Sequence, residues 1–213
     1  ANSSEGTACR PENKYLMEHD EEAYRLDIKI DEKRIRQQAA WAGIRPGMRV
    51  ADLGCGPGTI TAILHDMVQP GGSVVGVDGS AARLDYARKK YGAEGIEYRA
   101  ANLALPLDDL GSFDFIWVRF VLEYSLSGSF DMVRSFARSL KPGGILCLID
   151  LDHNPLNYYG TPARLDRTFK KSMQELESNF NFDPYVGRKL YSFLYDLGFG
   201  DIDVRVENHR VTF

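Results

Sequence analysis

Short apolar runs alternate with amphipathic stretches along most of the chain, up to Asp150. The apolar runs predict strands at residues 49–53, 73–77, 96–100, 113–118 and 145–150. Helical spacing of apolar residues predicts helices at residues 24–41, 59–68, 81–91 and 130–140. Apolar strands that alternate with helices are buried on both faces, which is typical of a mostly parallel sheet covered on both sides. With right-handed crossovers, this pattern predicts a doubly wound α/β fold.

The region after Asp150 departs from this alternation. Residues 162–178 and 185–197 predict two further helices, and residues 201–213 have the character of a strand. A seventh strand does not fit into what remains, so we expect the last strand of the sheet to be missing from this sequence.

Composition excludes several other classes of protein. Hydrophobic residues make up 44% and charged residues 26% of the 213 residues, which is ordinary for a globular protein. No apolar run is long enough for a membrane-spanning helix. The net charge of −4 argues against a dedicated nucleic-acid surface, which is usually strongly basic. The three cysteines, Cys9, Cys55 and Cys147, are far apart, which predicts free thiols in a reducing, cytoplasmic compartment.

A glycine-rich segment follows the first predicted strand. It reads Asp-Leu-Gly-Cys-Gly-Pro-Gly-Thr over residues 52–59. In an open parallel sheet, ligands bind at the carboxyl ends of the strands, near the point where the strand order reverses. Glycines let the backbone turn tightly and approach a ligand, and the next helix presents free N–H groups to an anion. Asp78 ends the second strand, where its carboxylate could accept hydrogen bonds from ribose hydroxyls, so we expect a nucleotide-type ligand.

Four segments in this order resemble the motifs of class I S-adenosylmethionine-dependent methyltransferases. Asp-x-Gly-x-Gly-x-Gly, headed by Asp52, resembles their first motif, and Val-Val-Gly-Val-Asp-Gly-Ser at residues 74–80 resembles the second-strand motif. Ser-Phe-Asp-Phe-Ile at residues 112–116 and Leu-Lys-Pro-Gly-Gly at residues 140–144 resemble two later motifs. The resemblance covers residues 49–150. It implies a Rossmann-like methyltransferase fold, S-adenosylmethionine as cofactor and methyl transfer to a small molecule.

The resemblance also assigns cofactor-binding roles by position. It implies that Gly54 and Gly56 bring backbone against the methionine portion and that Asp52 helps to bind its amino group. It implies that Asp78 holds the ribose. The full set of expected cofactor residues is Asp52, Gly54, Cys55, Gly56, Asp78, Gly79, Ser80, Asn102, Leu103, Arg119 and Arg25.

Four of these positions carry particular expectations. Asn102 stands where the family usually has an acidic residue that accepts from the adenine amino group; its amide oxygen can still accept, without a charge. Leu103 could supply a backbone N–H to the ring, and Arg119 lies where the family's chain passes the cofactor. Arg25 matches a residue that reaches the methionine carboxylate in some relatives, although an ion pair with a neighbouring glutamate is the open alternative.

The resemblance divides the chain into two parts. We expect residues 1–45 to form a tail and a helix that cap the cofactor site. Residues 46–213 then form the methyltransferase domain, with helices on the substrate side at residues 155–197. The many aromatic residues in this last region suggest an apolar or aromatic substrate. The sequence does not indicate an oligomeric state.

Catalytic candidates lie beyond the fourth and fifth strands. Methyl transfer in a dry pocket depends largely on positioning, so a dedicated base is required only if the acceptor arrives protonated. No dyad is evident from the sequence, and the catalytic residues stay unknown, with His153, Glu123 and Tyr124 as candidates. Oxygen ligands after the fifth strand would suit magnesium, at Asp150, Asp152 and Asn154. We nevertheless expect no metal.

Two other functions stay open at this point. A nicotinamide-dependent oxidoreductase would have Gly-x-Gly-x-x-Gly, and here the third glycine, Gly58, comes one residue early. A catalytically silent S-adenosyl-binding module would keep the fold without transfer, and Asn102 and the missing strand leave room for it. An RNA or protein substrate is a further alternative to a small molecule.

Overall fold

The computed structural model describes residues 30–153, 160 and 162–207. These residues contain one five-stranded sheet of order β3-β2-β1-β4-β5. The strands are β1 (Arg49–Leu53), β2 (Ser73–Asp78), β3 (Ile96–Ala100), β4 (Phe113–Arg119) and β5 (Leu140–Ile149). All four strand pairings are parallel, which confirms the predicted sheet. The order reverses between β1 and β4, so the carboxyl ends of these two strands flank the expected ligand site.

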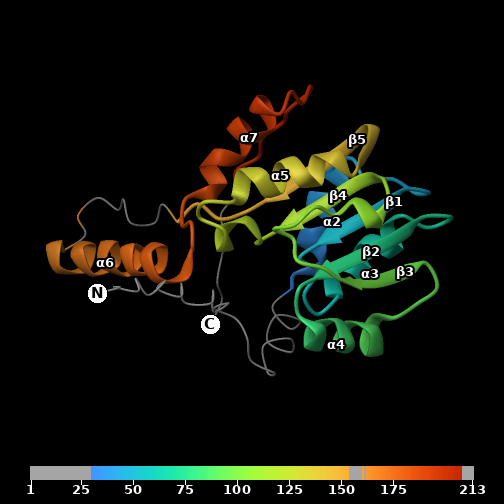
Figure 1. Ribbon diagram of the computed structural model, residues 1–213, viewed down its shortest axis with the longest axis horizontal. Coiled ribbons are helices and arrows are strands. Elements are labelled where there is room, and N and C mark those ends of the chain that lie inside the picture. Colours follow the sequence, from blue (N-terminus) through green and yellow to red (C-terminus); the bar gives the residue numbers. More distant parts are fainter. Residues whose placement is uncertain (1–29, 154–159, 161, 208–213) are drawn as a thin grey trace, which may run out of the picture.

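Helices cover both faces of this sheet (Figure 1). The helices are α2 (Glu32–Ala42), α3 (Thr59–Met67), α4 (Ala81–Tyr91), α5 (Ser129–Arg138), α6 (Ala163–Phe180) and α7 (Leu190–Asp196), with short 3₁₀ helices η1 (Asp108–Leu110), η2 (Leu122–Tyr124) and η4 (Val186–Lys189). Side chains alternate along a strand, and β4 shows this clearly. Phe115 and Trp117 pack under α2 and α3, whereas Ile116 and Val118 pack under α5. The doubly wound prediction is therefore confirmed.

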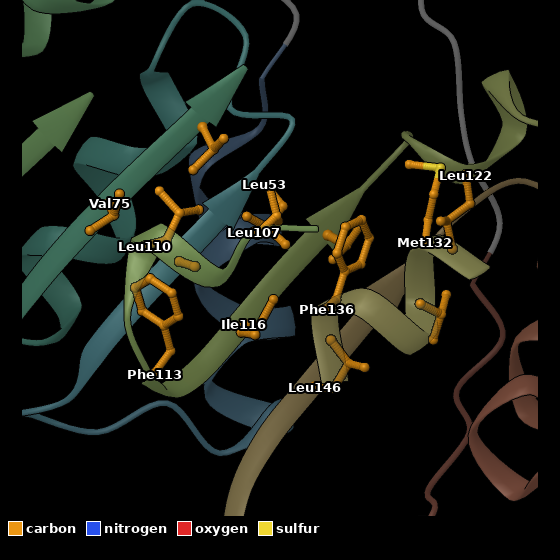
Figure 2. Packing of buried hydrophobic residues seen from close by; sticks show 14 of the residues in the cluster. Leu53, Val75, Leu107, Leu110, Phe113, Ile116, Leu122, Met132, Phe136 and Leu146 are labelled. Carbon is orange, nitrogen blue, oxygen red and sulfur yellow. The ribbon is translucent and has the colours of Figure 1, made fainter. Parts of the chain in front are cut away.

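The larger core lies between the sheet and α5. Figure 2 shows Phe136 and Met132 of α5 beside Ile116, Leu146 and Leu122. Phe136 is completely buried, so it contributes one of the largest apolar side chains of this layer. α7 covers the outer end of the same layer, where its Phe193 meets Phe130 with ring centroids 5.4 Å apart.

Most predicted elements are confirmed with ends that differ by at most two residues. Within the described part of the predicted helix at residues 24–41, α2 begins only at Glu32. Asp31 caps α2, its Oδ1 accepting from the backbone N–H of Arg34 at 3.1 Å, so residues 30 and 31 are not helical. Residues 24–29, Arg25 among them, lie outside the described residues.

The predicted strand at residues 145–150 begins too late, because residues 140–144 also belong to β5. Leu140 pairs with Phe113 and Ile145 pairs with Phe115, so the residues between them bulge out of the ladder without ending the strand. The predicted helix at residues 185–197 is divided into η4 and α7. A Cβ at Gly187 would lie 2.8 Å from the backbone of Leu151, so only a glycine allows the chain to approach this closely.

The C-terminal prediction also needs correction. Residues 201–207 form no strand, and residues 208–213 lie outside the described residues. In Figure 1, α6 projects away from the sheet, and none of its residues is buried. Among the described helices, none combines the length and apolar character that crossing a membrane requires.

Candidate cofactor and acceptor site

The glycine loop after β1 has a backbone that only glycine adopts easily. Gly54, Gly56 and Gly58 have φ values of +82°, +53° and +86°. A Cβ on Gly54 would overlap with Cγ2 of Val121, which follows β4. The backbone N–H of Gly54 donates to the carbonyl of Val77 at 2.7 Å, which ties the loop to the end of β2. The loop is thus confined between β2 and the chain that leaves β4.

Asp78 is fixed against this loop. Its Oδ2 accepts from the backbone N–H of Gly56 at 2.9 Å, and its Oδ1 accepts from that of Ser80 at 2.8 Å. The guanidinium of Arg83 lies 3.6 Å from Oδ1. A carboxylate oxygen can accept more than one hydrogen bond, so both oxygens keep capacity for ligand hydroxyls.

A cavity of about 470 Å³ opens beside Asp78, at the ends of β2 and β3. Its lining residues are Gly79, Ala100, Ala101, Asn102 and Leu103. The structure therefore brings together Asn102 and Leu103, which we expect near the adenine, and Gly79 of the expected cofactor set. Oδ1 of Asn102 accepts from the backbone N–H of Ala104 at 3.0 Å, which orients its side chain.

Asp52 is buried at the carboxyl end of β1. Burial raises its pKa to about 7, while a hydrogen bond from the hydroxyl of Thr61, 2.6 Å from its Oδ2, counteracts this rise. The charge of Asp78 raises the pKa further, and that of Arg119 lowers it. A buried carboxyl group of this kind becomes fully ionised when a cation is placed beside it. It therefore suits a ligand with a positive group.

Arg119 ends β4, where the charges of Asp52 and Asp150 act on its guanidinium group. Its Nε is buried and has no hydrogen-bond partner among the described residues. Burial lowers its pKa to about 10, an effect that Arg34 reinforces and the charges of Asp52 and Asp150 oppose. Its guanidinium carbon lies 4.0 Å from the centre of the Phe120 ring. A buried donor without a partner is costly in a folded protein, and it points to a role in binding an acceptor group.

Asp150 organises the turn after β4. Its Oδ2 accepts from the backbone N–H groups of Val121, Leu122 and Glu123 at 3.2, 2.8 and 3.3 Å. Burial raises the pKa of Asp150 to about 7, with the charge of Glu123 as the next cause. This carboxylate therefore acts as the cap of η2, and its oxygens already bind backbone.

The alternative of a metal at this edge gains no support. Asp152 binds Arg188 through both carboxylate oxygens, at 2.7 and 2.8 Å. Asn154 lies outside the described residues. Within the part of the chain that the structure describes, no cluster of His, Cys, Asp and Glu could hold a metal ion.

The three catalytic candidates, His153, Glu123 and Tyr124, lie close together beyond β4 and β5. Nε2 of His153, after β5, lies 3.5 Å from Oε2 of Glu123 in η2. The ring of Phe182 lies 5.7 Å from the ring of His153 and 5.7 Å from that of Tyr124. The segments after β4, β5 and α6 thus meet at these side chains. Their proximity is a structural fact, while their catalytic role stays a prediction.

Sequence analysis missed one residue of this region, Thr61, and the structural role of another, Asp150. Thr61, which binds Asp52, is a polar residue on the buried face of α3, and its position between Ile60 and Ile63 was the available signal. The role of Asp150 as a cap had no signal in sequence, because its partners are backbone groups of a distant segment.

Comparisons with known proteins agree with this geometry. A family described as Methyltransferase domain matches residues 51–148. A demethylmenaquinone methyltransferase of Lactococcus lactis is 31% identical over 144 residues, which are 62% of this chain and 56% of the relative. A ubiquinone/menaquinone biosynthesis C-methyltransferase of Shewanella sediminis is 38% identical over 114 residues, 51% of this chain and 45% of the relative. This chain thus spans about half the length of these two relatives.

A solved structure shares the fold. It is a SAM-dependent methyltransferase from Aquifex aeolicus, with a TM-score of 0.59 and 21% identity over 84% of this chain and 88% of that one. The parallel sheet, the glycine loop and the carboxylate at the end of β2 define a nucleotide-binding α/β domain. The sequence matches show a methyltransferase domain at residues 51–148, and they support the resemblance to class I S-adenosylmethionine-dependent methyltransferases.

Proposed function

We propose that the protein transfers the methyl group of S-adenosylmethionine to a small aromatic acceptor. The observation that carries this proposal is the set of groups around the glycine loop. Asp78 is held by two backbone N–H groups, and its neighbour Gly79 lines an open cavity, while the buried carboxyl group of Asp52 and the unpartnered Nε of Arg119 suit a charged ligand. The match of residues 51–148 to a methyltransferase domain supports S-adenosylmethionine rather than a nicotinamide as this ligand.

The residues at the site fit this cofactor. We assign its ribose to Asp78, its adenine to the cavity of Gly79, Asn102 and Leu103, and its amino group to Asp52. Arg119 supplies a buried donor for the methionine carboxylate. When bound, the cofactor supplies a methyl group on a positively charged sulfur, with a neutral thioether as the leaving group. The chain's contribution is to hold both reactants and to exclude water.

The acceptor site lies beyond β4 and β5 in this proposal. The rings of Phe182, Tyr124 and His153 pack together there. The names of the two curated relatives refer to quinone biosynthesis, and we extend an aromatic acceptor to this chain. We further propose that residues 1–45 cap the cofactor. Of these, the described helix α2 packs through Ile35 and Ala39 against the layer that contains α3.

We also propose that the protein works in a reducing, cytoplasmic compartment. The two cysteines within the described residues, Cys55 and Cys147, are both free and buried. Free thiols are common in reducing compartments, where disulfides do not persist.

A transfer assay with tritium-labelled S-adenosylmethionine tests the function. The acceptors are a panel of phenols and hydroquinones, with bulk tRNA and a protein extract as macromolecular alternatives. We expect label in one or more small aromatic compounds. Label in tRNA or protein alone would contradict the small-molecule acceptor. Cofactor binding with no transfer to any acceptor would favour a silent binding module.

A further inference from the structure

The Glu123 carboxylate is an unusual feature of the acceptor side. Its side chain exposes only 5% of its area, yet Oε2 has no hydrogen-bond partner among the described residues. Nε2 of His153, which faces it at 3.5 Å, is also buried and also lacks such a partner. Buried polar groups are nearly always hydrogen-bonded, and exceptions often have a catalytic role.

We propose that Glu123 and His153 form an acid–base pair that removes a proton from a phenolic or hydroquinone acceptor. This inference rests on the proposed methyl transfer and names the class of acceptor for the same site. In it, His153 is the catalytic base, and Glu123 is a positioning residue that orients the imidazole and stabilises its charged form.

Backbone contacts hold both members of the pair. The backbone N–H of His153 donates to the carbonyl of Pro184 at 2.7 Å, and the carbonyl of Glu123 accepts from the N–H of Asp183 at 2.7 Å. The Asp150 carboxylate holds the N–H of Glu123 from the other side. Contacts from the segments after β4, β5 and α6 thus fix the position of Glu123 relative to His153. Such preorganisation is what acid–base catalysis requires.

The pair also lies next to the cofactor loop. Val121, two residues before Glu123, is in direct contact with Gly54, where a Cβ would overlap with it. The turn that carries Glu123 is therefore packed against the loop that we assign to the methionine portion. A base in this place can act on a nucleophile that is bound close to the transferred methyl group.

The proton transfer follows from the orientation of the imidazole. With hydrogen on Nε2, facing the carboxylate, the lone pair of His153 lies on Nδ1. The acceptor O–H bond breaks, a hydrogen–Nδ1 bond forms, and the electron pair stays on the acceptor oxygen as the nucleophile. The Glu123 carboxylate stabilises the resulting imidazolium. The His153 side chain exposes 30% of its area, so it can return the proton to water.

The charged groups around the pair come from several segments. Asp150 faces Glu123 from the end of β5, and its own pKa is raised by burial. Asp183 is neutralised by Lys189, and Asp152 pairs with Arg188. The acidic groups on these neighbouring segments are thus either buried or paired with a basic side chain. An imidazole can ionise a phenol but is too weak a base to ionise an aliphatic alcohol, and this difference favours a phenolic acceptor.

The test uses 4-nitrophenol, whose visible absorbance reports its ionisation. The probe is bound to the protein already saturated with S-adenosylhomocysteine. In the wild type, we expect the pKa of bound 4-nitrophenol to fall by about one unit, a roughly tenfold change in its ionisation constant. His153→Asn should abolish this shift, and Glu123→Gln should reduce it. His65→Asn and Glu97→Gln, the same exchanges at distant sites, should leave it intact.

Several results would overturn the proposal. One is bound 4-nitrophenol that is no more ionised than the free probe, and another is an equal shift in wild type and His153→Asn. Failure of 4-nitrophenol to bind the S-adenosylhomocysteine complex would also overturn it. 4-Nitroanisole, which has no proton to lose, checks that His153→Asn keeps the pocket. If a variant does not fold, the wild-type shift alone decides. Lack of S-adenosylhomocysteine binding would instead count against the proposed function.

Discussion

The backbone N–H of Gly56 donates a hydrogen bond of 2.9 Å to Oδ2 of Asp78. This bond joins the glycine loop after β1 to the carboxylate at the end of β2. Because the N–H of Ser80 holds the other oxygen, the carboxylate is oriented before a ligand arrives. Loop and carboxylate therefore form one preorganised unit, and such preorganisation lowers the ordering cost of binding.

The close approach of Gly54 to Val121 predicts a specific loss of stability. Gly54→Ala places a Cβ at φ +82°, where it also overlaps with Val121. Gly71→Ala is a matched control, since Gly71 has φ +83° and no heavy atom within 4 Å of its Cβ position. We expect both variants to lose about 1–2 kcal/mol for the left-handed backbone, and Gly54→Ala to lose about 1–3 kcal/mol more from overlap. Urea unfolding measures the difference, and equal losses would show that Val121 gives way freely.

The core between the sheet and α5 predicts a second loss of stability. Phe136 is fully buried, so Phe136→Ala should lower the free energy of unfolding by about 3–5 kcal/mol. Phe169→Ala is the control, because Phe169 lies on α6 and is 39% exposed. We expect its loss to stay below about 1 kcal/mol. A similar loss in both variants, measured by urea unfolding, would contradict this description of the core.

Burial of Asp52 predicts a dependence of stability on pH. Its pKa rises from 3.8 to about 7, so between these values the folded state holds a proton that the unfolded chain has released. Stability then falls as the pH rises across this window. Asp52→Asn removes this proton, so the slope should become less steep by up to about 1.4 kcal/mol per pH unit. Unfolding at several pH values measures the slope. Asp85→Asn, at an exposed ion pair, should leave it unchanged, and an unchanged slope in Asp52→Asn would refute the assignment.

Arg119 and Asp52 together predict how ligand affinity depends on pH. A cationic amino group binds better to ionised Asp52, so the affinity for S-adenosylhomocysteine should rise as the pH passes about 7. The charge of Arg119 lowers the pKa of Asp52. Arg119→Met should therefore weaken binding and move this rise to higher pH. Titrations across pH measure both effects. Arg138→Met, on the exposed end of α5, should change neither. An unchanged dependence of affinity on pH in Arg119→Met would show that Arg119 does not influence the pKa of Asp52.

The sequence predicted the strands of the sheet and the helices that cover it well, because proline and glycine residues separate these elements. Residues 49–53, 81–91 and 96–100 match the structure at both ends. The same rule failed at residues 141–144. There, Leu140 pairs with Phe113, so the strand continues past a proline and two glycines. Tertiary pairing outweighed local turn preference at this point.

The parts of the candidate site that could be predicted are the glycine loop and the acidic residues of the sequence motifs. Asp52, Asp78 and the loop glycines stand at fixed distances from strand ends, so local sequence locates them. The contact between Glu123 and His153 could not be predicted in this way. It depends on how the turns after β4 and β5 meet the segment around Phe182, and no local pattern encodes that meeting.

Calorimetric titration with S-adenosylhomocysteine, with NADH in parallel, tests the central claim most directly. We expect S-adenosylhomocysteine to bind the wild type and Asp85→Asn equally. Asp78→Asn should bind it about tenfold or more weakly, because it loses charge-assisted hydrogen bonds. NADH should not bind. Binding of NADH without S-adenosylhomocysteine, or equal affinity in Asp78→Asn and Asp85→Asn, would contradict the proposed site.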